Sequence, residues 1–255
     1  IPTRPCLRMT QPPPMTLFIS DLHLCEQRPA AAQRFIEFLR QDACDADALY
    51  ILGDLFEAWL GDDDDSDFHQ NITHALHACV SRGTPVFLLH GNRDFLIGTE
   101  FERQSGCRLL PDPSVITLGD LPALIMHGDT LCTDDIEYQE FRVTVRDPQW
   151  QQKFLAQPLP QRREVARHLR DESKMRTREK SEQIMDANQQ AVERVMREHH
   201  IKLLIHGHTH RPAMHDFTLE GEPVRRIVLG DWYEQGSVLT HDSHGFILSR
   251  LPFSP

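Results

Sequence analysis

The stretch Thr16-Leu17-Phe18-Ile19-Ser20-Asp21-Leu22-His23-Leu24 opens as an apolar run and ends by presenting a carboxylate and an imidazole. A short apolar run bounded by polar residues is typical of a buried strand. Asp21 and His23 are two positions apart, so both fall on the same side of its carboxyl end. In open α/β sheets, ligands collect at the carboxyl ends of the strands. The stretch therefore predicts the beginning of a metal chelate at one edge of a parallel sheet.

Later segments repeat this arrangement of an apolar run followed by Asp, Asn or His. They are Tyr50-Ile51-Leu52-Gly53-Asp54, Val86-Phe87-Leu88-Leu89-His90-Gly91-Asn92-Arg93-Asp94, Leu124-Ile125-Met126-His127-Gly128-Asp129 and Leu203-Leu204-Ile205-His206-Gly207-His208-Thr209-His210. A lone Asp after a strand is usually a turn residue or a helix N-cap. Here D-x-H, G-D, G-N, H-G-D and G-H-x-H follow one another in order, which argues against a purely structural explanation and predicts one shared site.

Apolar residues at helical spacing predict helices over 32–39 and 68–80, between the first strands. Strands and helices that alternate at this interval predict a parallel sheet with right-handed crossovers. From residue 115 onwards the predicted strands are short, and turns such as Leu118-Gly119-Asp120 indicate hairpins. These strands are expected at 115–118, 123–127, 227–229, 238–240 and 246–249.

Length and composition fit one large domain, or one domain with an insertion, because 255 residues are 40% hydrophobic and 25% charged. The net charge of −11 argues against a nucleic-acid-binding surface, and the acidic run at 62–67 is predicted to be a solvated loop. Six cysteines without C-x-x-C spacing predict reduced thiols in a cytosolic protein. Residues 1–14 lack the apolar core of a signal peptide and are expected to form a flexible extension.

The ordered blocks resemble the calcineurin-like metallophosphoesterases, whose pattern is D-x-H, G-D, G-N-H-[DE], an isolated His and G-H-x-H. The match extends from about Leu17 to His210. One departure is that Arg93 stands where most of the family has a His often considered a general acid. With this substitution and a helical insertion, the chain resembles the UDP-2,3-diacylglucosamine pyrophosphatases of bacterial lipid A synthesis, a group within that family.

The resemblance implies an α/β fold, a sandwich of two mixed sheets flanked by helices with an inserted helical cap. Its core would comprise 15–133 and 200–255, and its cap 134–199. It also implies two metal ions, one held by Asp21, His23, Asp54 and His210, the other by Asp54, Asn92, His127 and His208, with Asp54 as the bridge. Relatives are typically manganese enzymes, so two Mn²⁺ are expected, although a mixed O/N shell also tolerates Fe or Zn.

The implied reaction is two-metal hydrolysis of UDP-2,3-diacylglucosamine at the α-phosphate, which gives UMP and 2,3-diacylglucosamine 1-phosphate (lipid X). The implied catalytic residues are Asn92, Arg93, His127 and His208, and the implied substrate contacts are Asn92, Arg93, Asp135, Ser173, Thr177, Lys180 and His208. A guanidinium stays charged and does not donate a proton. Arg93 therefore suits a leaving group that departs unprotonated, as a phosphomonoester anion does.

The segment between Asp129 and Ile205 has no glycine and predicts inserted helices; from Arg162 to Lys180 it carries eight Lys or Arg against four Asp or Glu. One interpretation is a solvated helix pair with i,i+4 charge pairs. The other is a cap with a cationic face for an anionic substrate and membrane, and an apolar face for acyl chains. Candidates for that apolar lining are Phe141, Val143, Val145, Trp150, Phe154, Leu155, Val165, Leu169 and Met175.

Two other functions remain open. One is a different metallophosphoesterase, acting on a cyclic nucleotide, a nucleotide pyrophosphate or a phosphoprotein. The other is a non-catalytic scaffold of the same fold. In the favoured interpretation the protein is a monomer that associates peripherally with the cytoplasmic face of the inner membrane, since no apolar stretch approaches the roughly 20 residues that span a bilayer.

Overall fold

Two mixed β-sheets form the centre of the molecule. The computed structural model describes residues 14–179, 184 and 186–253, and of 171–179 only the backbone. The first sheet has the order β11-β10-β1-β2-β3-β4 and the second β5-β6-β7-β9-β8. Strands β1 to β4 are parallel, as are β6, β7 and β9, while β10, β11, β5 and β8 pair antiparallel. The strands are β1 (Thr16–Ile19), β2 (Ala48–Ile51), β3 (Val86–Leu88), β4 (Arg108–Leu109), β5 (Ser114–Leu118), β6 (Leu121–Met126), β7 (Leu203–His206), β8 (Ala213–Leu219), β9 (Glu222–Val228), β10 (Gln235–Asp242) and β11 (Gly245–Pro252).

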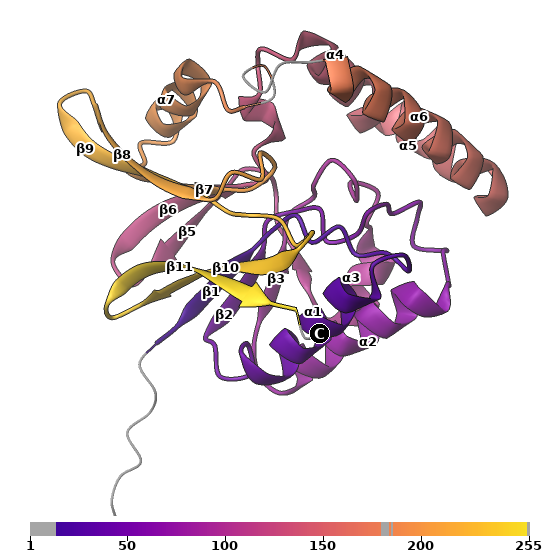
Figure 1. Cartoon of the computed structure of the whole chain (residues 1–255), viewed down its shortest axis with the longest axis horizontal. Coiled ribbons are helices and arrows are strands. Elements are labelled where there is room, and N and C mark those ends of the chain that lie inside the picture. Colours follow the sequence, from indigo (N-terminus) through magenta and orange to yellow (C-terminus); the bar gives the residue numbers. More distant parts are fainter. Residues whose placement is uncertain (1–13, 180–183, 185, 254–255) are drawn as a thin grey trace, which may run out of the picture.

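The sheets pack face to face through a cluster that includes Phe18, Ile125 and Ile205, all fully buried. Helices α1 (Pro29–Gln41) and α2 (Asp67–Ser81) cover the outer face of the first sheet, and α7 (Gln189–Glu198) covers the second (Figure 1). The expected sandwich of two mixed sheets flanked by helices is therefore confirmed.

The covering helices form where the apolar spacing predicted them. In α2, Ser66 accepts a hydrogen bond from the His69 backbone N–H and so caps the helix, while Ile72 and Leu76 are buried against the sheet. The strand β8 was not predicted, because most of its side chains are exposed and show no clear alternation. Helix α3 (Thr99–Ser105), a short element after β3, was also missed.

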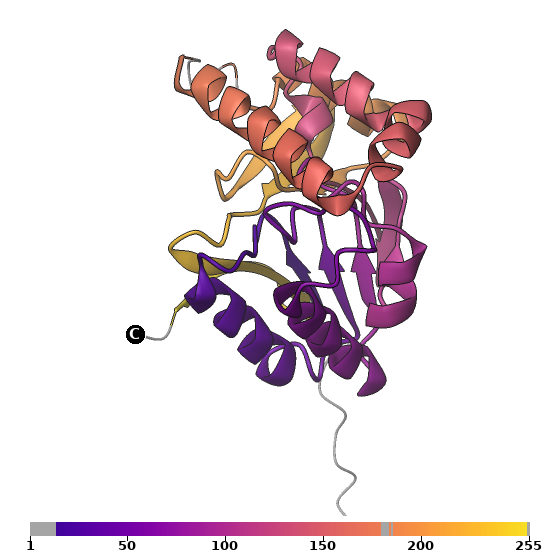
Figure 2. The same ribbon diagram turned by 90° about the vertical axis from the view of Figure 1, so that its right-hand side faces the viewer.

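Three further helices lie over the strand ends: α4 (Ile136–Arg146), α5 (Pro148–Leu155) and α6 (Leu159–Glu179). Figure 2 shows them as a separate layer above the sheets. The segment 134–199, expected as the cap, is thus divided. Its last helix, α7, packs on the second sheet through Val192 and Met196, so we use the word cap for α4, α5 and α6 only.

The prediction that the acidic run is a solvated loop is confirmed only in part: Asp63, Asp65 and Asp67 are exposed, whereas Asp64 is buried and Asp62 is partly buried. The Asp62 carboxylate accepts hydrogen bonds from the backbone N–H groups of Gly98, Glu100 and Phe101 at 2.9 to 3.1 Å, which satisfies the free donors at the start of α3. Asp63 pairs with Arg162 and Asp64 with Arg163. The carboxylates therefore join the core to the basic helix α6.

Candidate metal centre and its cavity

All seven predicted metal ligands lie together at the carboxyl ends of five strands. Ile19, Ile51 and Leu88 are register partners across β1, β2 and β3, so the loops that follow these strands start at one level. On the second sheet Met126 pairs with His206. The loops bring together Asp21 and His23 after β1, Asp54 after β2, Asn92 after β3, His127 after β6, and His208 and His210 after β7.

The backbone at these positions is unusual. Asp21, His23, Asp54, His208 and His210 all have positive φ, between 49° and 67°. Non-glycine residues rarely adopt this left-handed conformation, which costs of the order of 1 kcal/mol or more each and clusters at functional sites. Five of the seven side chains are thus presented by tight, left-handed turns.

The glycines of the G-D, G-N and G-H blocks allow the loops to approach one another. A Cβ on Gly91 would overlap the carboxylate and backbone nitrogen of Asp54, and one on Gly207 would overlap the side chains of Ser20 and Asp21. A side chain at either position would push these loops apart, so glycine is required by close backbone approach.

One group of candidate ligands comprises Asp21, His23 and His210, whose ligand atoms lie within 4.8 Å of one another. The Asp21 Oδ1 to His210 Nε2 distance is 3.3 Å, and the two imidazole Nε2 atoms are also 3.3 Å apart. Asp54 Oδ2 lies 3.7 Å from His23 Nε2. These atoms converge on one small space.

Asn92 and His208 meet His127 on the other side of Asp54. Asn92 Oδ1 lies 3.0 Å from both His127 Nε2 and His208 Nδ1, and His127 Nε2 is 3.8 Å from Asp54 Oδ2. His127 Nδ1 is 2.9 Å from the carbonyl oxygen of Leu52. When Nδ1 donates to that carbonyl, the lone pair of Nε2 is left for a cation.

Buried charges shift the pKa values of these groups in opposite directions. Burial raises the pKa of Asp54 to about 7. Burial opposes the charged form of His127, but the neighbouring carboxylates, above all Asp54, raise its pKa to about 9. Burial and the positive His127 lower the pKa of His208 to about 3. A cation beside Asp54 would favour the charged form of this buried carboxylate.

The donor set fits divalent ions. Asp21 and Asp54 are 0% and 1% exposed, and Asp21 Oδ1 has no hydrogen-bond partner among the described residues. Buried carboxylate oxygens without donors are costly unless they meet a cation. Carboxylate, imidazole and amide ligands together suit transition-metal ions such as Mn, Fe or Zn.

Several residues around the site were not predicted. The buried Asp94 carboxylate accepts from the N–H groups of Gly91 and Leu55 at 2.8 and 2.7 Å, which fixes two ligand loops. Tyr138 stacks on His208 and donates its hydroxyl hydrogen to Asp129 at 2.7 Å. Asp94 belongs to the G-N-R-D block and could have been noticed there, whereas no sequence spacing links Tyr138 to His208.

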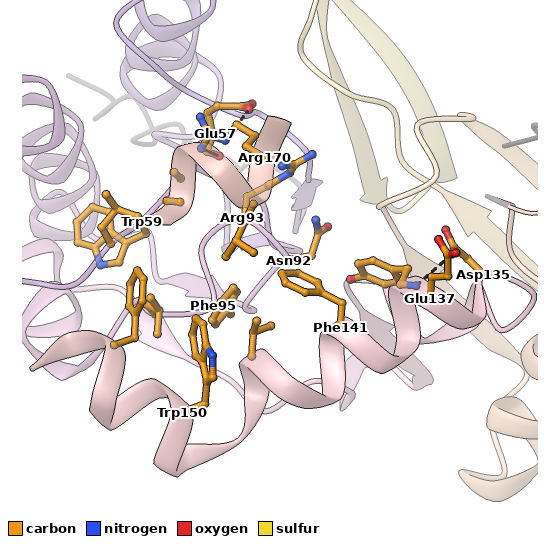
Figure 3. A pocket seen from close by; sticks show the side chains of 18 residues that line it. Glu57, Trp59, Asn92, Arg93, Phe95, Asp135, Glu137, Phe141, Trp150 and Arg170 are labelled. Carbon is orange, nitrogen blue, oxygen red and sulfur yellow. Dashed lines mark hydrogen bonds and ion pairs between the residues drawn. The ribbon is translucent and has the colours of Figure 1, made fainter. Parts of the chain in front are cut away.

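A cavity of about 180 Å³ extends from the site into the cap (Figure 3). Asn92 and Arg93 belong to its lining, and so does Asp135, which caps α4 by accepting from the Tyr138 N–H. The remaining wall is mainly apolar. The predicted lining residues found there are Phe141, Val145, Trp150, Phe154 and Leu169.

The other predicted lining and contact residues lie elsewhere or are not described. Val143 and Leu155 are 72% and 40% exposed and are not among the lining residues, and Val165 packs against the core under the first sheet. Lys180 lies outside the described residues, and so do the side chains of Ser173, Met175 and Thr177, whose backbone belongs to α6.

Comparison with known proteins shows close relatives over nearly the whole chain. The calcineurin-like phosphoesterase family model matches residues 15–212. The UDP-2,3-diacylglucosamine hydrolase of Azotobacter vinelandii is 52% identical over 93% of this chain and 98% of its own length. Its namesakes from Enterobacter sp. and Escherichia coli O7:K1 are 52% and 50% identical, each over 93% of this chain and 99% of their own length.

Proposed function

This chain belongs to the calcineurin-like phosphoesterase family, and we propose that it is the member that hydrolyses UDP-2,3-diacylglucosamine at the α-phosphate, giving UMP and 2,3-diacylglucosamine 1-phosphate in lipid A synthesis. The identity of 50 to 52% to hydrolases of that name supports this substrate. The structural observation that carries the proposal is the continuity of the Asp/His/Asn cluster with an apolar cavity under the cap.

In this proposal two divalent ions occupy the cluster, with Mn²⁺ the preferred ion. One ion would be held by Asp21, His23, Asp54 and His210, and the other by Asp54, Asn92, His127 and His208. Asp54 Oδ2 lies 3.7 Å from His23 Nε2 and 3.8 Å from His127 Nε2, which supports Asp54 as the bridge. Such a pair of ions polarises the phosphoryl group and lowers the pKa of water.

The protein groups around the reacting phosphate have separate tasks. The Arg93 side chain lines the cavity beside the candidate ligand Asn92, where its permanent charge stabilises charge that develops on the phosphoryl oxygens. Its backbone N–H donates to Asp54 Oδ1 at 2.7 Å and so fixes the bridging carboxylate. Asn92 and His208 orient the same phosphate from the facing loops.

The cavity provides the place for the acyl chains. Its wall combines rings and aliphatic side chains from the cap and from the loop after Asp54, including Trp59, Phe141 and Leu169. Apolar surface in such a cavity favours acyl chains by about 25 cal/mol per Å² removed from water. Asp135 lines the cavity near Tyr138, where a sugar hydroxyl is its expected partner.

The excess of Lys and Arg in the sequence 162–180 is our reason to propose peripheral association with the anionic inner-membrane surface. We propose that the monomer takes its lipid substrate there, on the cytoplasmic side. Within the part of the chain that the structure describes, no helix has both the length and the apolar character to cross a membrane.

The direct test is hydrolysis of UDP-2,3-diacylglucosamine with Mn²⁺ by the wild type and by His127→Ala. UMP is followed by chromatography and the lipid product by mass spectrometry. We expect Mn²⁺-dependent release of UMP that the variant lacks. If the wild type binds Mn²⁺ and cleaves bis(p-nitrophenyl) phosphate but leaves the lipid intact, the substrate assignment is wrong.

A pair of charged substitutions on α4 tests the cavity. Phe141 lines it, whereas Val143, on the same helix, is 72% exposed and does not. Phe141→Asp is expected to raise the KM for the lipid substrate at least tenfold, because a charge would have to be buried beside the acyl chains. Val143→Asp should leave KM within twofold. Equal effects of both would argue against acyl chains in this cavity.

A further inference from the structure

Glu57 joins a candidate metal ligand to the cap. It follows Asp54 by three residues, lines the cavity and has a side chain 22% exposed. Its Oε2 lies 3.5 Å from His23 Nδ1 and 3.5 Å from the Arg28 guanidinium, and its Oε1 lies 3.8 Å from Arg170 Nε. Figure 3 shows Glu57 beside Arg170, above Arg93.

The His23 ring has one nitrogen turned to the candidate metal centre and one turned to Glu57. Nε2 faces Asp21, Asp54 and His210 at 3.3 to 4.0 Å. Nδ1 is buried and has no hydrogen bond among the described residues. A neutral imidazole whose Nε2 is a ligand carries its proton on Nδ1, and ligating histidines commonly direct that N–H at a carboxylate. Glu57 is in the position for this role.

On the cap side, Arg170 of α6 holds the same residue in two ways. Its NH2 group donates to the Glu57 carbonyl oxygen at 2.8 Å, and its Nε faces the Glu57 carboxylate. Arg28 adds a third link, because its NH2 group donates to the His23 carbonyl oxygen and also approaches Glu57. The orientation of His23 is thus connected to the position of α6 through one acidic side chain.

We propose that Glu57 is a positioning residue that orients the His23 ring toward its metal ion. Through Arg170, Glu57 also makes metal affinity depend on how α6 packs against the core. This rests on the proposed two-metal function. In this role Glu57 acts through His23 and Arg170 and is not a ligand of the ions. Removal of the Arg170 side chain is therefore expected to weaken metal binding.

The test measures Mn²⁺ affinity of metal-stripped protein by calorimetric titration, independently of turnover. The variants are Glu57→Ala, Glu57→Gln, Arg170→Ala and the double variant Glu57→Ala/Arg170→Ala. Arg163→Ala is the matched control, because Arg163 also lies on α6 and joins it to the core through Asp64 at 3.0 Å without contact to Glu57 or His23. Circular dichroism checks that each variant is folded.

We expect Glu57→Ala to weaken Mn²⁺ binding about 10- to 100-fold, and Glu57→Gln to weaken it less, since the amide oxygen still accepts from Nδ1–H. Arg170→Ala should weaken it severalfold in the wild type but not further in Glu57→Ala. Arg163→Ala should bind as the wild type does. Unchanged affinity in both Glu57 variants, or additive effects of Glu57 and Arg170, would overturn the proposal.

The same titration separates this proposal from the proposed function. Wild type that binds Mn²⁺ but does not cleave the lipid contradicts the substrate assignment, and the affinities of the variants still decide the role of Glu57. Wild type that binds no Mn²⁺ contradicts both.

Discussion

At the scale of single residues, the Asp54 carboxylate is buried among several polar and titratable groups. Asp54 is 1% exposed, accepts from the Arg93 N–H and faces two imidazoles. Burial raises its pKa from 3.8 to about 7. Without an ion, the folded chain therefore binds a proton here that the unfolded chain releases, and this contribution to stability is lost as the pH rises from about 4 to about 7.

Asp54→Asn is accordingly expected to stabilise the metal-stripped protein. At pH 8 the free energy of unfolding should rise by about 1 to 3 kcal/mol, because a neutral amide replaces a buried charge. The same variant should gain nothing from Mn²⁺ and lose activity. Urea unfolding of wild type and variant at pH 4 and pH 8 measures this, and a stability difference independent of pH would contradict it.

Gly91→Ala is expected to disrupt the site by volume alone. The new methyl group would overlap Asp54, so the loops after β2 and β3 must separate, at a cost of about 1 to 3 kcal/mol. Mn²⁺ affinity should fall at least tenfold. Gly119→Ala is the control: nothing lies within 4 Å of its added Cβ, and it should cost about 1 kcal/mol for its left-handed φ with metal affinity unchanged.

At the scale of elements, hydrogen bonds and ion pairs attach α6 of the cap to the loop before α2. We call this set of contacts the clasp. Arg162 is 1% exposed and donates to the Leu60 carbonyl oxygen, the Gln157 carbonyl oxygen and the Asp63 carboxylate. A buried guanidinium is tolerated only when such partners surround it. The basic helix is therefore partly a structural counterpart of the acidic loop.

Arg162→Ala is expected to loosen the cap. The loss of its hydrogen bonds leaves the Leu60 carbonyl oxygen without this partner, so stability should fall by about 1 to 3 kcal/mol and protease cleavage within α5 and α6 should accelerate. Arg167→Ala, which removes only an exposed pair with Glu164 on the same helix, should change stability by less than about 0.5 kcal/mol. Equal cleavage rates would contradict the clasp.

At the scale of the whole molecule, the site joins the two sheets. The candidate ligands come from β1, β2 and β3 on one sheet and from β6 and β7 on the other, so ions at this edge would hold both halves of the sandwich. A ligand that binds only the folded state stabilises it by mass action.

Chelation should therefore lower the melting temperature of the whole protein in one cooperative transition. Restoring Mn²⁺ to 100 times its dissociation constant should return about 2.7 kcal/mol, measured by calorimetry. His23→Ala should reduce this gain. His244→Ala should keep it, because His244 is exposed in the β10–β11 turn at the amino-terminal end of β1, whereas the candidate ligands follow the carboxyl ends of the strands. Two separate transitions would contradict a site shared between the sheets.

The sequence by itself predicted the α/β class, helices α1 and α2, most strands and a shared site at the strand ends, because apolar runs ending in Asp, Asn or His are local patterns. The assignment of the seven candidate ligands came from the family resemblance of those blocks. Only the tertiary structure decided what those patterns contact. It placed α7 on the second sheet, paired Asp63 with Arg162 and Asp62 with the start of α3, and put Glu57 between His23 and Arg170. The longest of these links, from Arg170 to Glu57, joins residues more than a hundred positions apart. Local helical spacing indicates only partners three or four residues away, so it does not encode such distant partners.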